Sequence, residues 1–444
     1  MMKKPSTLVM LMLSGLVTLA QPPCHTTSSE DGSTYRIISK CDYTFREMLD
    51  EGVTTASRQV EILNIPIRQF GFVVKAYIKR HNFALGRRGI RKTTFRSVVF
   101  TYPSVTPTGE PVMLSGLVVM PLLQGNEPSR VLLYHRIIAS SYKIAPTNSL
   151  PIEAVLTADN TVCVFPDYYG IGMTEGEPLP FASFGYHARC ATECLLTALE
   201  IVKAEGVSLS EDHYTWNTGY SQGAGYALAT QKYIETVLPD SVSQRLNLRW
   251  SFCGGGVYSP AQLFEHAMVN NRLGSSPAIY LQSLRSFLHY NPAIPDTVSL
   301  SAFLSPNAIE AGIDSLMLSY DDGLWDLASR IEGLEGYRKA DDLFCRDMTD
   351  TSGALYRMVS CSFRDDDCTT GWIPKAQVVL YHSEDDSVAP FLLALQVQES
   401  LSDSENSCIL FPSGNGGSHS NASFKYFCQL LLFSEEKLYN RFCK

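Results

Sequence analysis

Apolar residues fall into short runs through the middle of the chain, and these runs alternate with longer amphipathic stretches. Residues 94–102 alternate between apolar and polar positions, which predicts a strand, and a turn signal at 106–111 leads into a second strand at 113–120. We expect these two strands to form an antiparallel hairpin. The continuous apolar run that follows, 130–134, is typical of a strand buried in a parallel sheet.

Strands and helices then alternate along the chain. This order implies a mostly parallel sheet with helices on both of its faces, which is an α/β fold. The predicted helices are 151–158, 186–205 and 224–235, and the predicted strands are 161–165, 213–218 and 246–253.

The pattern changes after residue 260, where apolar residues recur at three- and four-residue spacing with polar interruptions. We expect this stretch to be a helical cap inserted into the sheet domain. The sheet resumes at 376–381, and 407–411 is the final strand. Residues 35–85 carry no chemistry that the sequence assigns. The expected organisation is a signal peptide (1–20), an N-terminal extension (21–91), an α/β core (92–260 and 372–444) and the cap (261–371).

The first twenty residues have the pattern of a secretory signal peptide. Lys3 and Lys4 precede the apolar run 8–20, which is too short to span a membrane, and we predict cleavage after Ala20. The mature protein is therefore expected to be secreted or periplasmic. An alternative interpretation makes Cys24 an acylated cysteine, so that a lipoprotein anchor holds the protein to a membrane.

Charge and hydropathy exclude some partners. The 444-residue chain has a net charge of −9, which disfavours nucleic acids and anionic membranes as partners. Beyond the signal, no stretch reaches the roughly eighteen uninterrupted apolar residues of a membrane span.

The twelve cysteines lack the C-x-x-C spacing of zinc or redox sites. In an exported protein some of them are expected to pair, and the candidates are Cys361 with Cys345 or Cys368, and Cys408 with Cys428. Cys190 and Cys194 stand four residues apart on a predicted helix, and we expect them to be buried free thiols.

The strongest chemical motif is Gly219-Tyr-Ser-Gln-Gly223, which has the form G-x-S-x-G. It follows a predicted strand and precedes a predicted helix, as in a nucleophile elbow, where the serine backbone is strained and flanking glycines avoid a collision. The motif therefore predicts that Ser221 is a nucleophile.

A serine hydroxyl needs a base to take its proton and a carboxylate to orient that base. In a fold with such an elbow the acid and then the histidine follow the serine along the chain. His419 lies on a glycine-rich loop directly after the last strand, and it is our candidate base. Glu384, Asp385 and Asp386 compete as the acid after the strand 376–381. We favour Asp386, with Asp385 as the second choice.

The oxyanion formed by serine attack needs two N–H donors. One is expected from Gln222, which follows the nucleophile, and the other from the loop after the strand 130–134, at Arg136 or Ile137.

From residue 92 to 433 the chain resembles the α/β-hydrolase superfamily, and within it the secreted lipase and esterase branch related to fungal secretory lipases. The resemblance implies a triad of Ser221, Asp386 and His419, with no metal or cofactor. Arg136 departs from the pattern, since many relatives have His-Gly at this point; its side chain is expected to narrow the acyl pocket or to contact substrate. The stretches that carry the resemblance are Ser115–Pro121, Phe165–Gly172, Gly219–Gly223 and Cys253–Pro260.

These observations favour a secreted serine hydrolase that cleaves carboxylic esters through an acyl-enzyme, with a small-molecule acyl ester as substrate. Two alternatives stay open. A serine peptidase would use the same triad on a short peptide, and the acidic cap residues Asp341, Asp342 and 365–367 could then bind its amine. A binding protein that kept the fold and lost the reaction is the second, and Arg136 is its only hint.

Overall fold

The computed structural model describes residues 34–62, 70–123, 125, 127–137, 145–274, 277–292, 294–295, 298–318, 337–402, 407–413 and 417–433. The predicted signal peptide and Cys24 lie outside these residues. The boundaries of the four predicted segments stay predictions.

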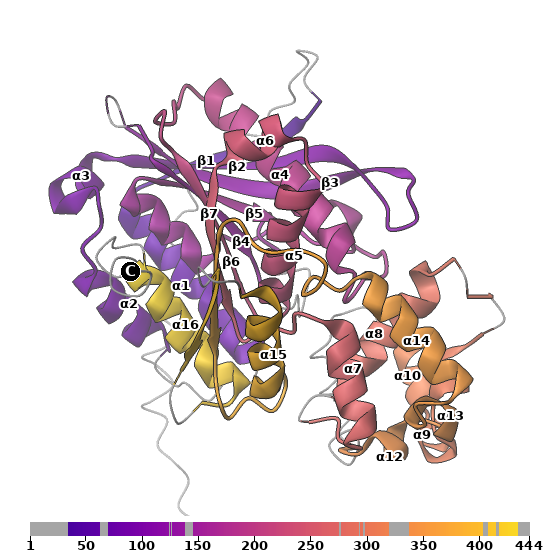
Figure 1. Ribbon diagram of the computed structural model, residues 1–444. Helices are drawn as coiled ribbons and strands as arrows, with labels where there is room; N and C mark the ends of the chain where they lie inside the picture. The colour runs from indigo at the N-terminus through magenta and orange to yellow at the C-terminus, as the bar shows by residue number, and fades with distance from the viewer. Residues whose placement is uncertain are drawn as a thin grey trace, which may run out of the picture.

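A mixed sheet forms the centre of the molecule (Figure 1). Its strands lie in the order β1-β2-β3-β5-β4-β6-β7-β8-β9. The pairs β1–β2, β2–β3 and β3–β5 are antiparallel, and the pairs from β5–β4 to β8–β9 are parallel. The strands are β1 (Arg36–Tyr43), β2 (Thr94–Val105), β3 (Pro111–Leu122), β4 (Arg130–His135), β5 (Thr161–Pro166), β6 (Tyr214–Tyr220), β7 (Leu248–Gly254), β8 (Gln377–His382) and β9 (Cys408–Pro412).

This architecture confirms the predicted hairpin and the parallel sheet that follows it. The hairpin is regular, because β2 and β3 pair in one register from Thr94–Leu122 to Val105–Pro111. The edge strand β1 was not predicted; it pairs with β2 through a register shift between Ile37 and Ser39, which interrupts the period-two pattern that marks a strand.

Helices cover both faces of the sheet, and each face has its own apolar core. Along β4, the side chain of Leu132 packs in the core below α1, α2 and α16, while Val131 and Leu133 pack in the core below α4. The predicted helix at 151–158 is a 3-10 helix. The helices that lie outside the sequence between β7 and β8 are α1 (Phe45–Ile62), α2 (Phe70–Arg80), α3 (Gly86–Lys92), η2 (Ile152–Asp159), η3 (Gly172–Thr174), α4 (Phe184–Ala204), α5 (Gln222–Thr236), α6 (Asp240–Leu246), α15 (Phe391–Leu401) and α16 (His419–Phe433).

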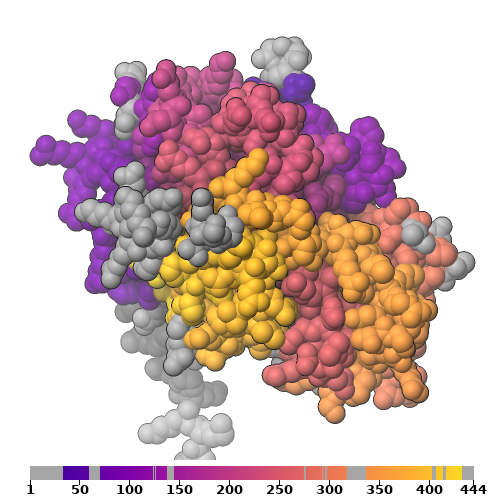
Figure 2. Space-filling view, viewed as in Figure 1, coloured from indigo at the N-terminus to yellow at the C-terminus, as the bar shows by residue number. Residues whose placement is uncertain are grey.

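A second group of helices occupies the sequence between β7 and β8, and Figure 1 shows it as a separate lobe beside the sheet. We call it the helical lobe; it has its own buried apolar cluster. In the space-filling view, the lobe borders the C-terminal part of the chain, which is coloured from orange to yellow (Figure 2). Its elements are α7 (Pro260–Val269), α8 (Pro277–Tyr290), η4 (Leu300–Phe303), α9 (Pro306–Glu310), α10 (Ile313–Leu318), α12 (Ala340–Leu343), α13 (Arg346–Thr349) and α14 (Ala354–Asp365).

The cysteines correct one set of predictions. Cys345, Cys361, Cys368, Cys408 and Cys428 are all free thiols, so both predicted disulfide pairings are wrong. The Cys368 thiol instead donates to the backbone carbonyl of Tyr258.

The other cysteines agree with expectation or reveal a different bond. Cys190 and Cys194 are buried free thiols on α4, as predicted. Cys41, on β1, is disulfide-bonded.

Within the described part of the chain, no helix combines the length and the apolar character needed to cross a bilayer.

Candidate active site

The turn from β6 into α5 holds Ser221 in a strained conformation. Its φ of 57° and ψ of −123° are unusual for a residue with a side chain. A Cβ at Gly219 would overlap the backbone of Gly223, and one at Gly223 would overlap the carbonyl oxygen of His135. Only glycine fits at either position. The two glycines of the G-x-S-x-G motif therefore allow the chain to make this sharp turn.

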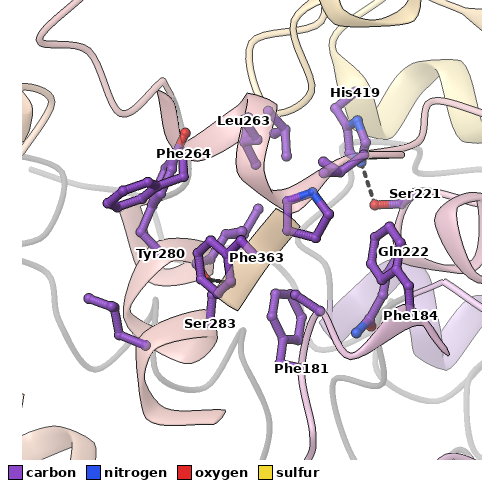
Figure 3. A pocket seen from close by; sticks show the side chains of 16 residues that line it. Phe181, Phe184, Ser221, Gln222, Leu263, Phe264, Tyr280, Ser283, Phe363 and His419 are labelled. Carbon is purple, nitrogen blue, oxygen red and sulfur yellow. Dashed lines mark hydrogen bonds between the residues drawn. The ribbon is translucent and has the colours of Figure 1, made fainter. Parts of the chain in front are cut away.

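His419 lies against the Ser221 hydroxyl, although 198 residues separate the two. Its Nε2 is 2.8 Å from Ser221 Oγ (Figure 3), and its Nδ1 is 2.7 Å from Asp386 Oδ2. Because a carboxylate only accepts hydrogen bonds, the ring proton belongs on Nδ1, and Nε2 is left as an acceptor for the serine proton. The three predicted side chains therefore form one hydrogen-bonded chain.

Two hydroxyl groups hold the segment that carries His419. The Tyr220 hydroxyl donates to the backbone carbonyl of His419 at 2.6 Å, and the Ser383 hydroxyl donates to the carbonyl of Gly417, also at 2.6 Å. Tyr220 is the last residue of β6, and Ser383 directly follows β8. They fix the start of α16 to the strand ends that carry Ser221 and Asp386.

Of the three candidate acids, Asp386 is the one whose carboxyl group lies against His419. Its Oδ1 accepts hydrogen bonds from the backbone N–H groups of Val388 and Ala389, both at 2.8 Å, which leaves Oδ2 directed at His419. Glu384 and Asp385 are exposed.

Burial by itself raises the pKa of the Asp386 carboxyl, but the charge and hydrogen bond of His419, with smaller contributions from His382 and Ala389, outweigh it. The resulting pKa lies below the usual value for Asp. Asp386 is therefore a carboxylate at neutral pH.

His382 closes the loop around this carboxylate. Burial lowers the pKa of its imidazole, so the ring is neutral, and Nε2–H donates to the carbonyl of Ala389 at 2.7 Å. The same nitrogen is 3.7 Å from Asp386 Oδ2. The ring of His382 thus connects the end of β8 to the backbone at Ala389.

The backbone N–H of Gln222 follows Ser221 directly and opens α5, and its role as the first oxyanion donor stays a prediction. The loop after β4 packs against the same turn, because the carbonyl oxygens of His135 and Arg136 both face the Cα of Gly223. The Tyr168 hydroxyl donates to the carbonyl of Arg136. The N–H groups of Arg136 and Ile137 stay predictions for the second donor.

The side chain of Arg136 does not have the position that the sequence suggested. It is only 4% exposed and does not line the cavity at Ser221, so it neither narrows that cavity nor contacts a ligand there. Burial lowers the pKa of its guanidinium, while the nearby carboxyl of Asp167 acts in the opposite direction. The guanidinium of Arg136 is thus buried in the protein interior and does not reach the cavity at Ser221.

A cavity opens beside Ser221, between the sheet and the helical lobe, with about 640 Å³ of space free of atoms, part of which is open to solvent. Figure 3 shows the rings of Phe181, Phe184 and Phe363 around the space in front of the hydroxyl. Its wall is mostly apolar, and His419 and Tyr280 are the titratable side chains among the described residues that line it. The lining residues are Phe181, Ala182, Phe184, Ser221, Gln222, Val257, Pro260, Leu263, Phe264, Ile279, Tyr280, Ser283, Leu284, Phe363, Val388 and His419.

Comparisons with solved structures decide the fold. The chain is similar to the rice cell wall degrading esterase LipA from Xanthomonas oryzae, with a TM-score of 0.65 and 18% identity over 92% of this chain and 98% of that one. It is also similar to a putative hydrolase from Legionella pneumophila, with a TM-score of 0.65 and 14% identity over 91% and 97% of the two chains. The chain has the α/β-hydrolase fold.

More distant similarity extends to Candida antarctica lipase A, with a TM-score of 0.53 and 13% identity over 74% of this chain and 73% of that one. No protein-family model matches the sequence, and no curated protein matches it in sequence. The α/β-hydrolase resemblance that the sequence motifs suggested is therefore confirmed at the level of structure.

Sequence reasoning named the three polar side chains that the structure brings together but not the wall of the cavity beside them. The residues that shape the cavity come mainly from the helical lobe and from residues 181–184, where no motif marks them. Tyr220 was quoted only as part of the elbow motif, and its bond to His419 depends on a contact across 199 residues. Among the described residues, no group of three or more His, Cys, Asp or Glu side chains is placed to hold a metal ion.

Proposed function

We propose that this α/β-hydrolase is a serine hydrolase that cleaves carboxylic esters through an acyl-enzyme. The observation that carries the proposal is the hydrogen-bonded chain Ser221–His419–Asp386 at the wall of an apolar cavity. A hydroxyl activated in this way attacks carbonyl carbon, and an apolar cavity beside it suits an acyl chain. The esterase and lipase named among the similar structures support the same class of reaction.

In the proposed reaction, Ser221 Oγ attacks the ester carbonyl carbon while His419 Nε2 takes the hydroxyl proton. Asp386 holds the resulting imidazolium by its Nδ1–H. The N–H of Gln222 stabilises the oxyanion. His419 then gives its proton to the departing alcohol, which leaves Ser221 acylated. A water molecule, deprotonated by His419, attacks the acyl group, and the carboxylic acid is released.

The peptidase alternative finds less support in the cavity. An amine of a peptide substrate would need an acid nearby, and none of the five acidic residues that suggested it lines the cavity at Ser221. Asp366 accepts a hydrogen bond from the N–H of Gly185, and Asp367 accepts from Ser259 and Thr369. The buried position of Arg136 likewise removes the hint that favoured a binding protein.

A fluorophosphonate probe and a short-chain p-nitrophenyl ester test the proposal together. Wild type should be labelled and should hydrolyse the ester, and Ser221→Ala should lose both activities. Ser352→Ala, which removes an exposed hydroxyl in the helical lobe, should keep both and serves as the control. Absence of labelling in folded wild type would reject the nucleophile, and faster turnover of aminoacyl amides than of esters would favour a peptidase.

We also propose that the protein is exported, as the signal-like first twenty residues suggest, and the disulfide at Cys41 supports this because such bonds persist in oxidising compartments. Cell fractionation followed by N-terminal sequencing tests it. A mature chain that begins just after Ala20 is expected. A fatty acyl group on Cys24 would show that the lipoprotein interpretation is right instead.

A further inference from the structure

A second cavity lies on the far side of the wall that bounds the cavity at Ser221. It has about 670 Å³ of space free of atoms, part of which is open to solvent, and it is also formed by the helical lobe and residues 181–183. Four residues line both cavities: Phe181, Ala182, Ser283 and Phe363. Because these residues face one cavity on each side, they form the partition between the two.

Phe363 is the residue of this partition whose ring is held from both sides. It packs edge-on against Phe264, which lines the first cavity, at a centroid distance of 5.7 Å. It also packs edge-on against Phe287, which lines the second, at 6.4 Å. Phe363 is buried, so its ring is fixed between the two spaces. In Figure 3 the ring lies among the side chains that surround the space beside Ser221.

The two cavities differ in chemistry. The first is lined mainly by aromatic and aliphatic side chains, whereas the second has a larger share of polar groups and includes carboxyl groups, which the first lacks; among its polar residues are Asn291, Ser362 and Asp366. Burial raises the pKa of Asp366 to about 6, which indicates a site where charge is poorly solvated. A hydrocarbon chain gains free energy with each methylene it buries in the first cavity and gains less in the second.

We propose that Phe363 sets the acyl-chain length that the enzyme accepts, by ending the apolar cavity that receives the acyl group. This inference rests on the proposed esterase function and narrows it to esters whose acyl chain ends at the partition. Activity should then rise roughly several-fold per added methylene while the chain lengthens inside the first cavity, and should fall once the chain meets the Phe363 ring.

The test measures kcat/KM for p-nitrophenyl esters from two to sixteen carbons, with folding of each variant checked by circular dichroism. Phe363→Ala should move the optimum toward longer chains by at least two carbons, because it opens the partition. Phe363→Leu makes a smaller opening and should move the optimum in the same direction. Should the alanine variant not fold, the leucine variant decides.

Phe287→Leu is the matched control, since it makes the same change beyond the partition and keeps an apolar side chain against Phe363. Its optimum should equal that of wild type. The proposal is overturned if folded Phe363 variants keep the wild-type optimum, or if Phe287→Leu moves it as far as Phe363→Leu. Failure of the esterase function itself would look different, because wild type would then hydrolyse none of the esters and would not react with a fluorophosphonate.

Discussion

Replacing Asp386 by asparagine should disable the reaction while leaving the fold intact, and the loop around Asp386 explains why. The backbone N–H groups of Val388 and Ala389 both point at Oδ1. An amide NH₂ cannot face two donors, so the asparagine must place its oxygen there and turn its NH₂ toward His419. Nδ1 of His419 then has to accept, and the ring proton moves to Nε2, facing Ser221. In that tautomer the imidazole cannot take the serine proton.

The size of the loss follows from the tautomer. A triad whose histidine is held in the wrong tautomer loses about 10⁴-fold in kcat in the best-studied serine proteases. Here we expect a loss of about 10³- to 10⁴-fold, or about 4 to 5.5 kcal/mol of transition-state stabilisation. KM should change little, since Asp386 does not line the cavity that receives the substrate.

The assay is the steady-state hydrolysis of a p-nitrophenyl ester, with thermal denaturation to establish that each variant is folded. Asp385→Asn and Glu384→Gln are matched controls, because both side chains are exposed on the same loop, and they should retain near wild-type kcat. The reasoning is refuted if folded Asp386→Asn keeps more than about a tenth of wild-type kcat, or if Asp385→Asn loses as much.

Three further predictions concern the surroundings of the site. Tyr220→Phe removes the hydrogen bond to the His419 carbonyl, and kcat should fall about fivefold with KM unchanged, which corresponds to the loss of about 1 kcal/mol of transition-state stabilisation. A variant with the same kcat and KM as wild type would show that this hydrogen bond does not position the imidazole ring. Gly223→Ala forces a Cβ into the carbonyl oxygen of His135, and both Tm and kcat/KM should fall, the latter about a hundredfold. Asp366→Asn should gain stability relative to wild type, by up to about 3 kcal/mol, as the pH rises from about 4 to 6. The reason is that wild type must then ionise a buried carboxyl group whose pKa is about 6. Urea denaturation at several pH values measures the free energy of unfolding of both proteins, and a difference between them that does not change with pH would contradict the prediction.

Sequence patterns predicted the strands that lie inside the sheet and pair without a register shift. The runs at β4 and β5 are continuous and apolar because both faces of these strands are covered, and such runs are visible in any sequence. β1 lies at the edge of the sheet and contains a register shift, so its buried positions do not alternate strictly and the strand was missed. The disulfide predictions failed for a related reason, since spacing along the chain does not report distance in space.

The choice among the three candidate acids shows what a sequence can decide and what it cannot. The end of β8 places Glu384, Asp385 and Asp386 in one loop, and their composition does not distinguish them. The distinction comes from the turn that follows, where Val388 and Ala389 present two N–H groups to one oxygen of Asp386. Such a bond pattern depends on backbone dihedral angles, which a motif does not specify.

The spacing of the site residues from their strands follows from the width of the sheet. β6, β8 and β9 run parallel, and their registers bring their carboxyl ends to the same edge. Neighbouring strands are about 4.8 Å apart, so β8 lies about 10 Å and β9 about 14 Å from β6. Ser221 comes one residue after β6, Asp386 four residues after β8, and His419 seven residues after β9. The connecting segment lengthens as the strand lies farther from Ser221, because each side chain has to return to the same point. The site could therefore be located from the order of strands and loop lengths, whereas its wall, built by the helical lobe, obeys no comparable rule.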